Sequence, residues 1–247
     1  MSHMSAPNTA MVLAAGLGVR MRPLSDAYPK PLVPLDGKPL IDHVLDRLAA
    51  AGVEKAVVNV HYMADRIEAH LTSRTSPAVE ISDERELLLD TGGGVARALG
   101  SLGEAPFFVI NADILWSDGP GGAALARLAA DFDAELMDAL LLLVPRERSV
   151  GYDGPGDFMS DARGRLERRG GAATAPYVFT GLQILSPRLF DACPDGAFSL
   201  NILYDRAIAS GRAFGIEHTG RWFHIGTPAG LELASAALGA AAQHRRP

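Results

Sequence analysis

An apolar segment close to the N-terminus, Ala10-Met11-Val12-Leu13-Ala14, leads directly into Gly16-Leu17-Gly18. A short apolar run that ends in glycines is the pattern of a buried strand followed by a tight loop. Because glycine has no Cβ, the backbone N–H groups of such a loop can approach a phosphate chain closely. The chain is therefore predicted to begin its fold with a buried strand, and the loop after it suits a polyphosphate. A glycine pair after a strand is, by itself, equally typical of a structural turn.

The apolar pattern after this loop alternates between helix and strand periods. From Leu40, apolar residues recur at helical spacing, and Gly52 stands where a helix C′ residue belongs. The next predicted elements are a strand over 55–60, a helix over 64–71, a strand over 78–81, a helix over 91–99 and a strand over 107–110. This alternation is typical of an α/β fold, whose ligands bind at the carboxyl ends of the strands.

The second half of the chain is predicted to add short antiparallel structure to this sheet. Segment 151–171 is rich in glycine and charge and has little periodicity, which indicates loops and short strands in a small lobe at the sheet edge. The other predicted elements are helices over 123–131, 187–192 and 201–209, strands over 139–144, 177–185, 214–218 and 222–225, and a last helix that begins at Thr227-Pro228. One mixed α/β domain is expected over residues 8–242. Residues 1–7 are interpreted as a disordered tag remnant, and 243–247 as a polar tail.

Charge and apolar content exclude several kinds of partner. With 23 basic residues against 29 acidic ones, the net charge of −6 gives no general attraction to nucleic acid or anionic lipid. The longest apolar run, Ala139–Val144, is far shorter than the roughly 20 residues that span a bilayer. A single cysteine, Cys193, and the lack of a secretory signal pattern predict a cytoplasmic protein. Because the net charge gives no general attraction to anions, any phosphate site must come from a local group of residues.

Two cations lie in and after the glycine loop. Arg20 follows the second glycine, and Lys30 stands in Pro29-Lys30-Pro31, in a chain where lysine is scarce. The loop is not a dinucleotide fingerprint, because Met21 stands where a third glycine is required, and it lacks the Gly-Lys-Ser/Thr of a Walker A loop. Arginine offers a planar fork of donors and lysine a compact charge, so two different phosphate groups could be held. The alternative is that both are surface cations.

The segment from Leu13 to Pro34 resembles the signature of the sugar-1-phosphate nucleotidyltransferases, the NDP-sugar pyrophosphorylases. The resemblance covers nearly the whole chain from about Ala10 and includes the motifs Thr91-Gly92-Gly93-Gly94, Asn111-Ala112-Asp113, Thr180-Gly181 and Trp222–Pro228. It implies a Rossmann-like, glycosyltransferase-A-like core with a mixed, mostly parallel sheet flanked by helices. The small antiparallel lobe would bind the sugar.

Within the family, the resemblance is greatest to members that join UTP and N-acetylmuramate 1-phosphate in bacterial cell-wall recycling. The features that carry it are the short length, the triple glycine, Gly156-Asp157-Phe158 and Trp222–Thr227. Members that make GDP-mannose from GTP and mannose 1-phosphate are the nearest alternative. The resemblance implies a nucleoside triphosphate (NTP) and a sugar 1-phosphate as substrates, and a monomer or small homo-oligomer.

The implied reaction is attack of a sugar-phosphate oxygen on the α-phosphorus of the NTP, which expels pyrophosphate. Because the nucleophile is already an anion, the enzyme needs positioning and charge neutralisation rather than a general base. Arg20 suits the β- and γ-phosphates, and Lys30 suits the α-phosphate and the sugar phosphate near it. The catalytic candidates are therefore Arg20, Lys30 and Asp113.

Asp113, after the strand over 107–110, is where the resemblance places Mg²⁺. The alternative is an N-cap or loop carboxylate. The family often supplies a second carboxylate where this chain has His224, and imidazole is a poor Mg²⁺ ligand. His224 therefore stands as a further metal candidate, as a contact to phosphate or metal-bound water, or as a core histidine. Asp157 and Asp205 are open as substitutes.

The remaining candidates follow the two substrates. Those for the nucleotide are Ala14, Ala15, Gly16, Gly18, Thr91, Gly92, Gly93 and Asn111. Those for the sugar phosphate are Gly156, Asp157, Thr180 and Gly181, with Trp222 either as an apolar wall or as core. The glycines after Thr91 could admit a flat base or only a tight helix entry. A non-catalytic nucleotide-sugar sensor that keeps the fold is the alternative from another class.

Overall fold

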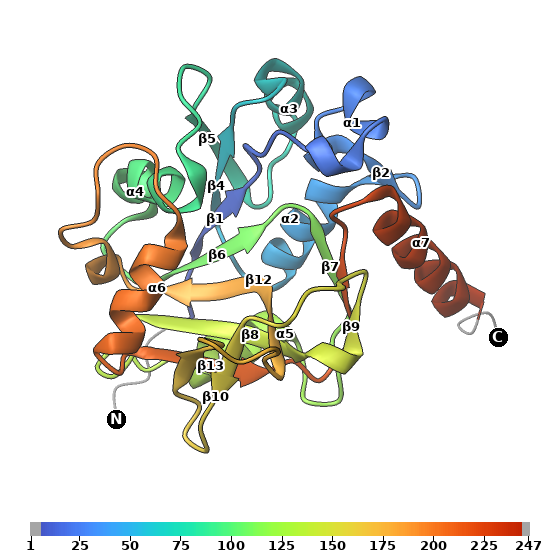
Figure 1. The fold of residues 1–247 in the computed structure, drawn as a ribbon. Helices are drawn as coiled ribbons and strands as arrows, with labels where there is room; N and C mark the ends of the chain where they lie inside the picture. Colours follow the sequence, from blue (N-terminus) through green and yellow to red (C-terminus); the bar gives the residue numbers. More distant parts are fainter. Residues whose placement is uncertain (1–5, 244–247) are drawn as a thin grey trace.

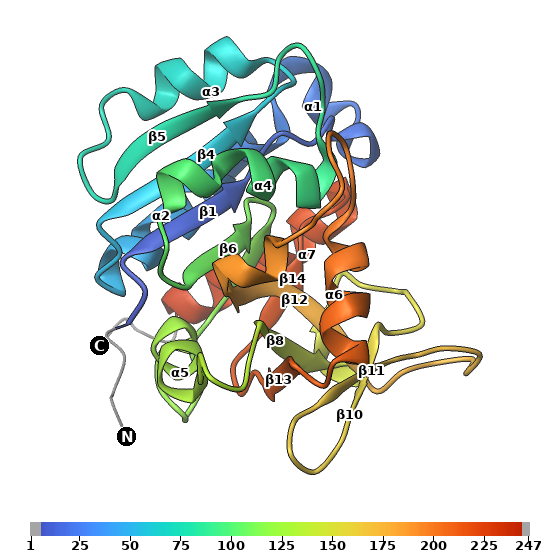
Figure 2. The ribbon, with the colours of Figure 1, turned by 90° about the vertical axis from the view of Figure 1, so that its left-hand side faces the viewer.

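A nine-stranded mixed sheet divides the molecule into three layers (Figures 1 and 2). The computed structural model describes residues 6–243. The strands of the main path, in spatial order, are β5 (Ala78–Asp83), β4 (Lys55–Val60), β1 (Thr9–Leu13), β6 (Phe107–Asn111), β12 (Tyr177–Leu185), β10 (Phe158–Ser160) and β11 (Leu166–Arg168); β8 (Ala139–Pro145) also pairs with β12, and β13 (Ala213–Glu217) pairs with β8.

Strand direction divides this sheet into two parts. β4 pairs parallel to β1 and β5, β1 pairs parallel to β6, and β13 pairs parallel to β8. β12 runs antiparallel to β6 and β8, and β10 and β11 form an antiparallel hairpin that pairs with the start of β12. The carboxyl ends of β1, β4 and β6 consequently meet at one edge. The predicted mixed α/β sheet flanked by helices, with a small antiparallel lobe, is confirmed.

Alternation of side chains along the strands supplies a core on each face. In β1, Ala10 and Val12 pack in the hydrophobic core on the first face of the sheet, and Met11 packs in the core on the second face. All three side chains are fully buried. The helices on the first face are α2 (Leu40–Ala50), α3 (Ala64–Leu71) and α5 (Ala124–Asp131). Those on the second are α4 (Asp90–Leu102) and α6 (Leu200–Ala209).

Several short elements beside the main sheet complete the fold. The strands β7 (Ile114–Trp116), β14 (Trp222–His224) and β9 (Ser149–Val150) form a three-stranded sheet, and β2 (Pro34–Leu35) pairs with β3 (Lys38–Pro39). The helix α7 (Pro228–Gln243) packs on these two small sheets and extends from the body of the molecule (Figure 1). The single-turn helices are α1 (Leu24–Ala27), η1 (Val19–Met21), η2 (Lys30–Leu32), η3 (Arg146–Arg148) and η4 (Pro187–Phe190).

The differences from the sequence prediction are local. The helix predicted over 187–192 is the shorter 3₁₀ helix η4. β7 is missing from the prediction, because three apolar residues form a strand only where a distant partner is present, here β14. Residues 1–5 and 244–247, where the predicted tag remnant and polar tail mainly fall, lie outside the described residues. Pro7, inside the predicted remnant, is buried, and Gln243 ends α7. None of the described helices has the length and apolar character needed to cross a membrane.

The central position of β8 gives a test of the core. Leu141 is fully buried in β8 among side chains of the second face, so Leu141→Ala should lower the free energy of unfolding by about 2–5 kcal/mol. Leu136 is 56% exposed, so Leu136→Ala should change it by less than about 0.5 kcal/mol. Urea denaturation measures both variants, and equal losses would contradict the described core.

Candidate functional site

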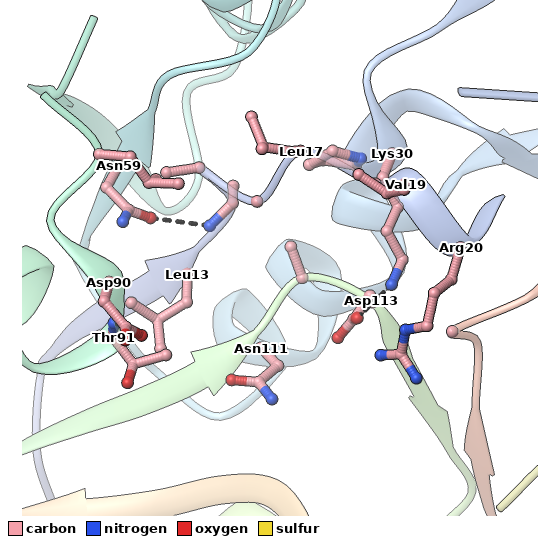
Figure 3. Close-up of a pocket in the computed structure, with 18 residues that line it drawn as sticks. Leu13, Leu17, Val19, Arg20, Lys30, Asn59, Asp90, Thr91, Asn111 and Asp113 are labelled. Carbon is pink, nitrogen blue, oxygen red and sulfur yellow. Dashed lines mark hydrogen bonds and ion pairs between the residues drawn. The ribbon is translucent and has the colours of Figure 1, made fainter. Parts of the chain in front are cut away.

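The glycine loop, β4 and β6 border a cavity of about 580 Å³ at the carboxyl ends of the parallel strands (Figure 3). Its lining includes Leu13–Arg20, Lys30, Asn59, Leu88, Asp90, Thr91 and Asn111–Asp113. Of the eight residues predicted to bind nucleotide, Ala14, Ala15, Gly16, Gly18, Thr91 and Asn111 lie on this lining. The three predicted catalytic residues, Arg20, Lys30 and Asp113, lie there as well.

Backbone geometry explains the composition of the glycine loop. Gly18 has φ +63°, in the left-handed region, and a Cβ there would lie 3.1 Å from the Lys30 Cβ and 3.2 Å from the Ser25 Cβ. The Ser25 hydroxyl donates to the Gly18 carbonyl at 2.8 Å, which fixes the turn. A Cβ on Gly16 would meet no other atom within 4 Å, and Gly16 is exposed and lines the cavity. The glycines therefore allow both the turn and the close approach of an anion.

Opposite charges gather at one end of this cavity. The Lys30 ammonium forms an ion pair with the Asp113 carboxylate, and their side chains are only 12% and 26% exposed. Arg20, on η1, extends toward the same end of the cavity (Figure 3), and it is exposed to solvent. Because desolvation strengthens charge interactions, this end of the cavity is suited to a polyphosphate and a cation.

The opposite end of the cavity has neutral hydrogen-bonding groups and one carboxylate. The Thr91 hydroxyl accepts a hydrogen bond from the Leu200 N–H at 3.0 Å, which ties the start of α4 to the start of α6. Asp90 has φ +59°, a conformation that aspartate adopts more readily than most residues, and it borders the cavity. This end of the cavity could accept a nucleoside.

Gly92 and Gly93, two of the residues predicted to bind the nucleotide, do not line this cavity. Their N–H groups donate to the Phe198 carbonyl at 2.8 and 3.0 Å, and neither residue is part of the cavity lining. A Cβ on Gly92 would lie 2.4 Å from the Phe198 ring, and one on Gly93 would lie 2.2 Å from the Gly196 carbonyl oxygen. These glycines allow the loop before α6 to pack tightly on α4, which matches the tight helix entry considered as the alternative.

A second cavity, of about 640 Å³, lies beside the first and shares Arg20 and Asn111 with it. Its lining includes Ile114, Gly151–Gly154, Val178–Thr180, Trp222, His224, Thr227, Ala229, Gly230 and Leu233. The Trp222 indole N–H donates to the Thr180 carbonyl at 2.8 Å, so Trp222 is both core and cavity wall. Gly181 packs against the Asn111 side chain, which a Cβ at this position would approach to 2.8 Å. Thr180 and Gly181, predicted to bind the sugar phosphate, thus lie at and beside the second cavity.

Gly156 and Asp157, also predicted to bind the sugar phosphate, line neither of these two cavities. Asp157 instead accepts a hydrogen bond from the Phe179 N–H at 2.8 Å, and the Gly156 N–H donates to the Tyr152 hydroxyl at 3.1 Å. Burial raises the pKa of Asp157, although the Phe179 N–H and nearby arginines oppose the shift. Both residues support the cavity wall formed by Tyr152 and Phe179.

His224 stacks on Trp222, with ring centroids 6.0 Å apart and planes at 29°, and it lines the second cavity. Burial lowers the pKa of His224, and Lys30 and Arg20 act in the same direction, while Asp113 opposes them. His224 is therefore neutral near pH 7. Within residues 6–243, no three His, Cys, Asp or Glu side chains are grouped as metal ligands. Asp205 is ion-paired with Arg168 at 2.6 Å and lines neither cavity.

Asn59, Asp90 and Tyr152 are among the cavity residues that are absent from the sequence prediction. Asn59 carried a signal, because it is the one polar residue in the apolar run 56–60. It is 3% exposed, and its side-chain oxygen accepts the Ala14 N–H at 2.7 Å, the left-hand dashed line in Figure 3. No sequence pattern indicated that Asp90 or Tyr152 would line a cavity, because their positions depend on backbone turns.

Comparison with known proteins assigns this fold and site to a class. Residues 9–154 match the family model described as nucleotidyl transferase, and the chain belongs to that family. It is 48% identical to N-acetylmuramate alpha-1-phosphate uridylyltransferase of Caulobacter vibrioides, over 94% of this chain and 98% of the relative. It is 37% identical to the protein of that name in Neisseria meningitidis serogroup B, over the same shares.

More distant relatives share the fold. Mannose-1-phosphate guanylyltransferase of Mycobacterium tuberculosis is 30% identical, over 93% of this chain and 64% of that protein. A solved structure of UDP-glucose pyrophosphorylase complexed with UDP-glucose aligns with a TM-score of 0.76 at 18% identity, over 94% of this chain and 98% of the other. The predicted class, sugar-1-phosphate nucleotidyltransferase, is thus confirmed. Enzymes of this family bind an NTP and a sugar 1-phosphate and generally use a divalent metal ion.

The buried Asp157 carboxylate predicts a pH dependence of stability. The pKa of Asp157 in the folded state lies above the ordinary aspartate value of 3.8, so the folded state holds this proton more tightly, and stability falls as pH rises through the raised pKa. The Asp157→Asn variant has no ionisable group at this position, so it does not lose this stability as pH rises. Its side-chain amide oxygen can still accept a hydrogen bond from the Phe179 N–H. Between about pH 4 and pH 7, the stability of the variant relative to wild type should therefore increase. Urea denaturation at several pH values measures this, and a constant or shrinking difference would show that burial does not control this carboxyl.

Proposed function

We propose that this protein joins UTP and N-acetylmuramate 1-phosphate to give UDP-N-acetylmuramate and pyrophosphate. The observation that carries the proposal is the adjacency of two cavities that share Arg20 and Asn111. Substrates bound in the two cavities would have their phosphates side by side near Arg20, Lys30 and Asp113. The two relatives of 48% and 37% identity, which cover nearly the whole chain, support the choice of UTP and this sugar phosphate.

The reaction is a displacement at the α-phosphorus of UTP. An oxygen of the sugar phosphate forms a new P–O bond there, the bond from the α-phosphorus to the bridging oxygen breaks, and pyrophosphate leaves with that electron pair. The nucleophile is already an anion near neutral pH, so no side chain needs to remove a proton. The barrier comes largely from repulsion between anions, which cationic side chains lower by neutralising charge.

Lys30 and Arg20 would supply this neutralisation in different ways. Lys30 is largely buried, and its compact ammonium would contact the α-phosphate and the attacking sugar phosphate. Arg20 borders both cavities, and its planar fork would hold the departing β- and γ-phosphates with paired hydrogen bonds. The Ala14 N–H is taken by Asn59, so the loop N–H groups after it, from Ala15 to Gly18, would add neutral donors on the nucleotide side.

The residues present fit a magnesium ion held mainly by substrate phosphates. Mg²⁺ in proteins commonly takes one or two carboxylates, phosphate oxygens and several waters, and Asp113 supplies one partly buried carboxylate at the cavity. When bound, Mg²⁺ would neutralise phosphate charge. The neutral imidazole of His224 adds no hard ligand, so its proposed place is in the sugar cavity.

The sugar side of the proposal rests on the second cavity. Thr180 and Gly181 would lie by the sugar, whereas Gly156 and Asp157 would act by holding Tyr152 and Phe179 in the cavity wall. UTP is a cytoplasmic metabolite, so the proposed reaction places the protein in the cytoplasm. A monomer or small homo-oligomer stays a prediction.

The proposed substrates are tested by single-turnover assays that offer each NTP with each sugar phosphate in the presence of MgCl₂. UTP with N-acetylmuramate 1-phosphate should release pyrophosphate fastest. No release from this pair would contradict the proposal. Release from GTP with mannose 1-phosphate would instead assign the activity named for the more distant relatives, and nucleotide binding without turnover would indicate a sensor.

Lys30→Arg tests the role of the compact ammonium. Gly18 and Asp113 confine the Lys30 side chain, so a larger guanidinium cannot occupy the same position, and kcat/KM should fall roughly 100-fold. Lys55→Arg is the matched control, because Lys55 lies in β4 and pairs with Glu80 away from both cavities, and its activity should be unchanged. Near-wild-type activity of Lys30→Arg would remove Lys30 from the proposed mechanism.

A further inference from the structure

Behind the first cavity, where the proposed function places the nucleotide and which is called the nucleotide cavity below, lies a carboxylate that the proposed mechanism does not use. Glu84 follows β5 and is 1% exposed. One of its oxygens accepts from the Asn59 side-chain amide at 2.8 Å, and the other accepts from the Leu89 N–H at 3.0 Å. Asn59 in turn accepts the Ala14 N–H at 2.7 Å. A buried, continuous chain of hydrogen bonds thus runs from Leu89 to Ala14.

This chain joins two separate walls of the nucleotide cavity. Ala14 is the first residue of the glycine loop, which lines the cavity as far as Arg20 at its charged end. Leu89 lies between Leu88 and Asp90, both of which line the opposite end. Glu84 itself is not part of the lining, so it touches neither end of a bound nucleotide. Its effect on the cavity must pass through Asn59 and Leu89.

Hydrogen-bond polarity explains why a carboxylate stands at this position. Asn59 presents its NH₂ group to Glu84 because its oxygen is taken by the Ala14 N–H, and the Leu89 N–H also points at Glu84. Two donors therefore face this side chain, and an ionised carboxylate accepts at both oxygens, whereas glutamine would turn its own NH₂ toward one of them. A buried donor left without an acceptor is costly, so this arrangement fixes the geometry.

A neighbouring helix is adapted to the same network. Gly94 lies inside α4, where glycine costs about 1 kcal/mol relative to alanine. A Cβ at Gly94 would lie 2.8 Å from the accepting oxygen of Glu84 and 2.9 Å from the Asn59 amide nitrogen. The close packing of α4 leaves Glu84 and Asn59 little room to rearrange.

We propose that Glu84 is a positioning residue that holds the glycine loop and the Leu88–Asp90 wall at the spacing that an NTP requires. The inference rests on the proposed binding of nucleotide in this cavity. Glu84→Gln should weaken UTP binding on the order of tenfold, because one donor of the network loses its acceptor. Isothermal calorimetry with UTP and MgCl₂, without sugar phosphate, measures this effect.

Steady-state kinetics distinguish positioning from a general loss of structure. In Glu84→Gln, KM for UTP should rise about tenfold while KM for the sugar phosphate stays within about twofold, because the second cavity lies outside the network. Glu86→Gln is the matched control. Glu86 lies two residues after Glu84 and is exposed, so the substitution removes the same charge without touching the buried network. Its UTP affinity should equal that of wild type.

A double variant tests the direction of the hydrogen bonds. In Glu84→Gln with Asn59→Asp, the new aspartate can accept from both Ala14 and the new glutamine, whose oxygen can accept from Leu89. The two changes together preserve the net charge and the number of non-hydrogen atoms. The pair should recover UTP affinity to within about threefold of wild type, whereas Asn59→Asp alone should bind weakly, because it places two carboxylates together.

The outcomes separate this inference from the proposed function. Equal UTP affinity of wild type and Glu84→Gln, or a double variant that binds no better than Glu84→Gln, overturns the positioning role. A change in the preference between UTP and GTP without an overall loss of affinity also overturns it, because it would mean direct contact with the base. If Glu84→Gln does not fold, the double variant decides. If wild type binds GTP and not UTP, the proposed substrate is wrong and the same variants are compared with GTP.

Discussion

Parallel pairing of β1 with β6 is the constraint on which the rest of the site depends. The register sets Leu13 opposite Asn111, so the glycine loop after one strand and Asp113 after the other begin at the same edge of the sheet. The loop turns back at Gly18 and delivers Lys30 to Asp113, where the two charges form a largely buried ion pair. Without this register the cations of the loop and the carboxylate of β6 would not meet. The antiparallel strand β12 on the other side of β6 then supplies the wall of a second cavity next to the first.

Charge balance at this edge explains how an acidic protein can handle two polyanions. The chain carries a net charge of −6, so long-range attraction does not favour its substrates. Under the proposed function, the attraction would be local and would come from Arg20, Lys30 and the loop N–H groups, in a place where burial strengthens it. Histidine at position 224 adds no charge near neutral pH, because burial and the two neighbouring cations keep it neutral. The proposed catalysis therefore depends on where fixed charges lie rather than on proton transfer.

The sequence located several residues that line the cavities, but it did not distinguish them from residues that pack behind the cavity walls. Arg20, Lys30, Asp113 and the loop glycines lie in one contiguous pattern or at a strand end, so the sequence locates them. Gly92, Gly93, Gly156 and Asp157 carry equally recognisable motifs, yet their backbone and side-chain groups face Phe198, Tyr152 and Phe179 instead of a cavity. A motif indicates that a residue is constrained, but a glycine constrained by packing looks the same in sequence as one constrained by a ligand. Glu84 gave no signal at all, since a single acidic residue in a charged segment is ordinarily solvated.

The amino-acid sequence by itself determined the alternation of the main strands and helices, the α/β class and the position of the glycine loop after the first strand, because apolar periodicity and glycine placement act over a few neighbouring residues. It also located the cations and the carboxylate of the candidate active site. Only the tertiary structure decided that β7 and β14 form a strand pair, that two cavities share Arg20 and Asn111, and that Glu84, Asn59 and Ala14 form one buried network. These features join residues far apart in the chain. Their geometry depends on strand register and side-chain packing, which no local pattern encodes.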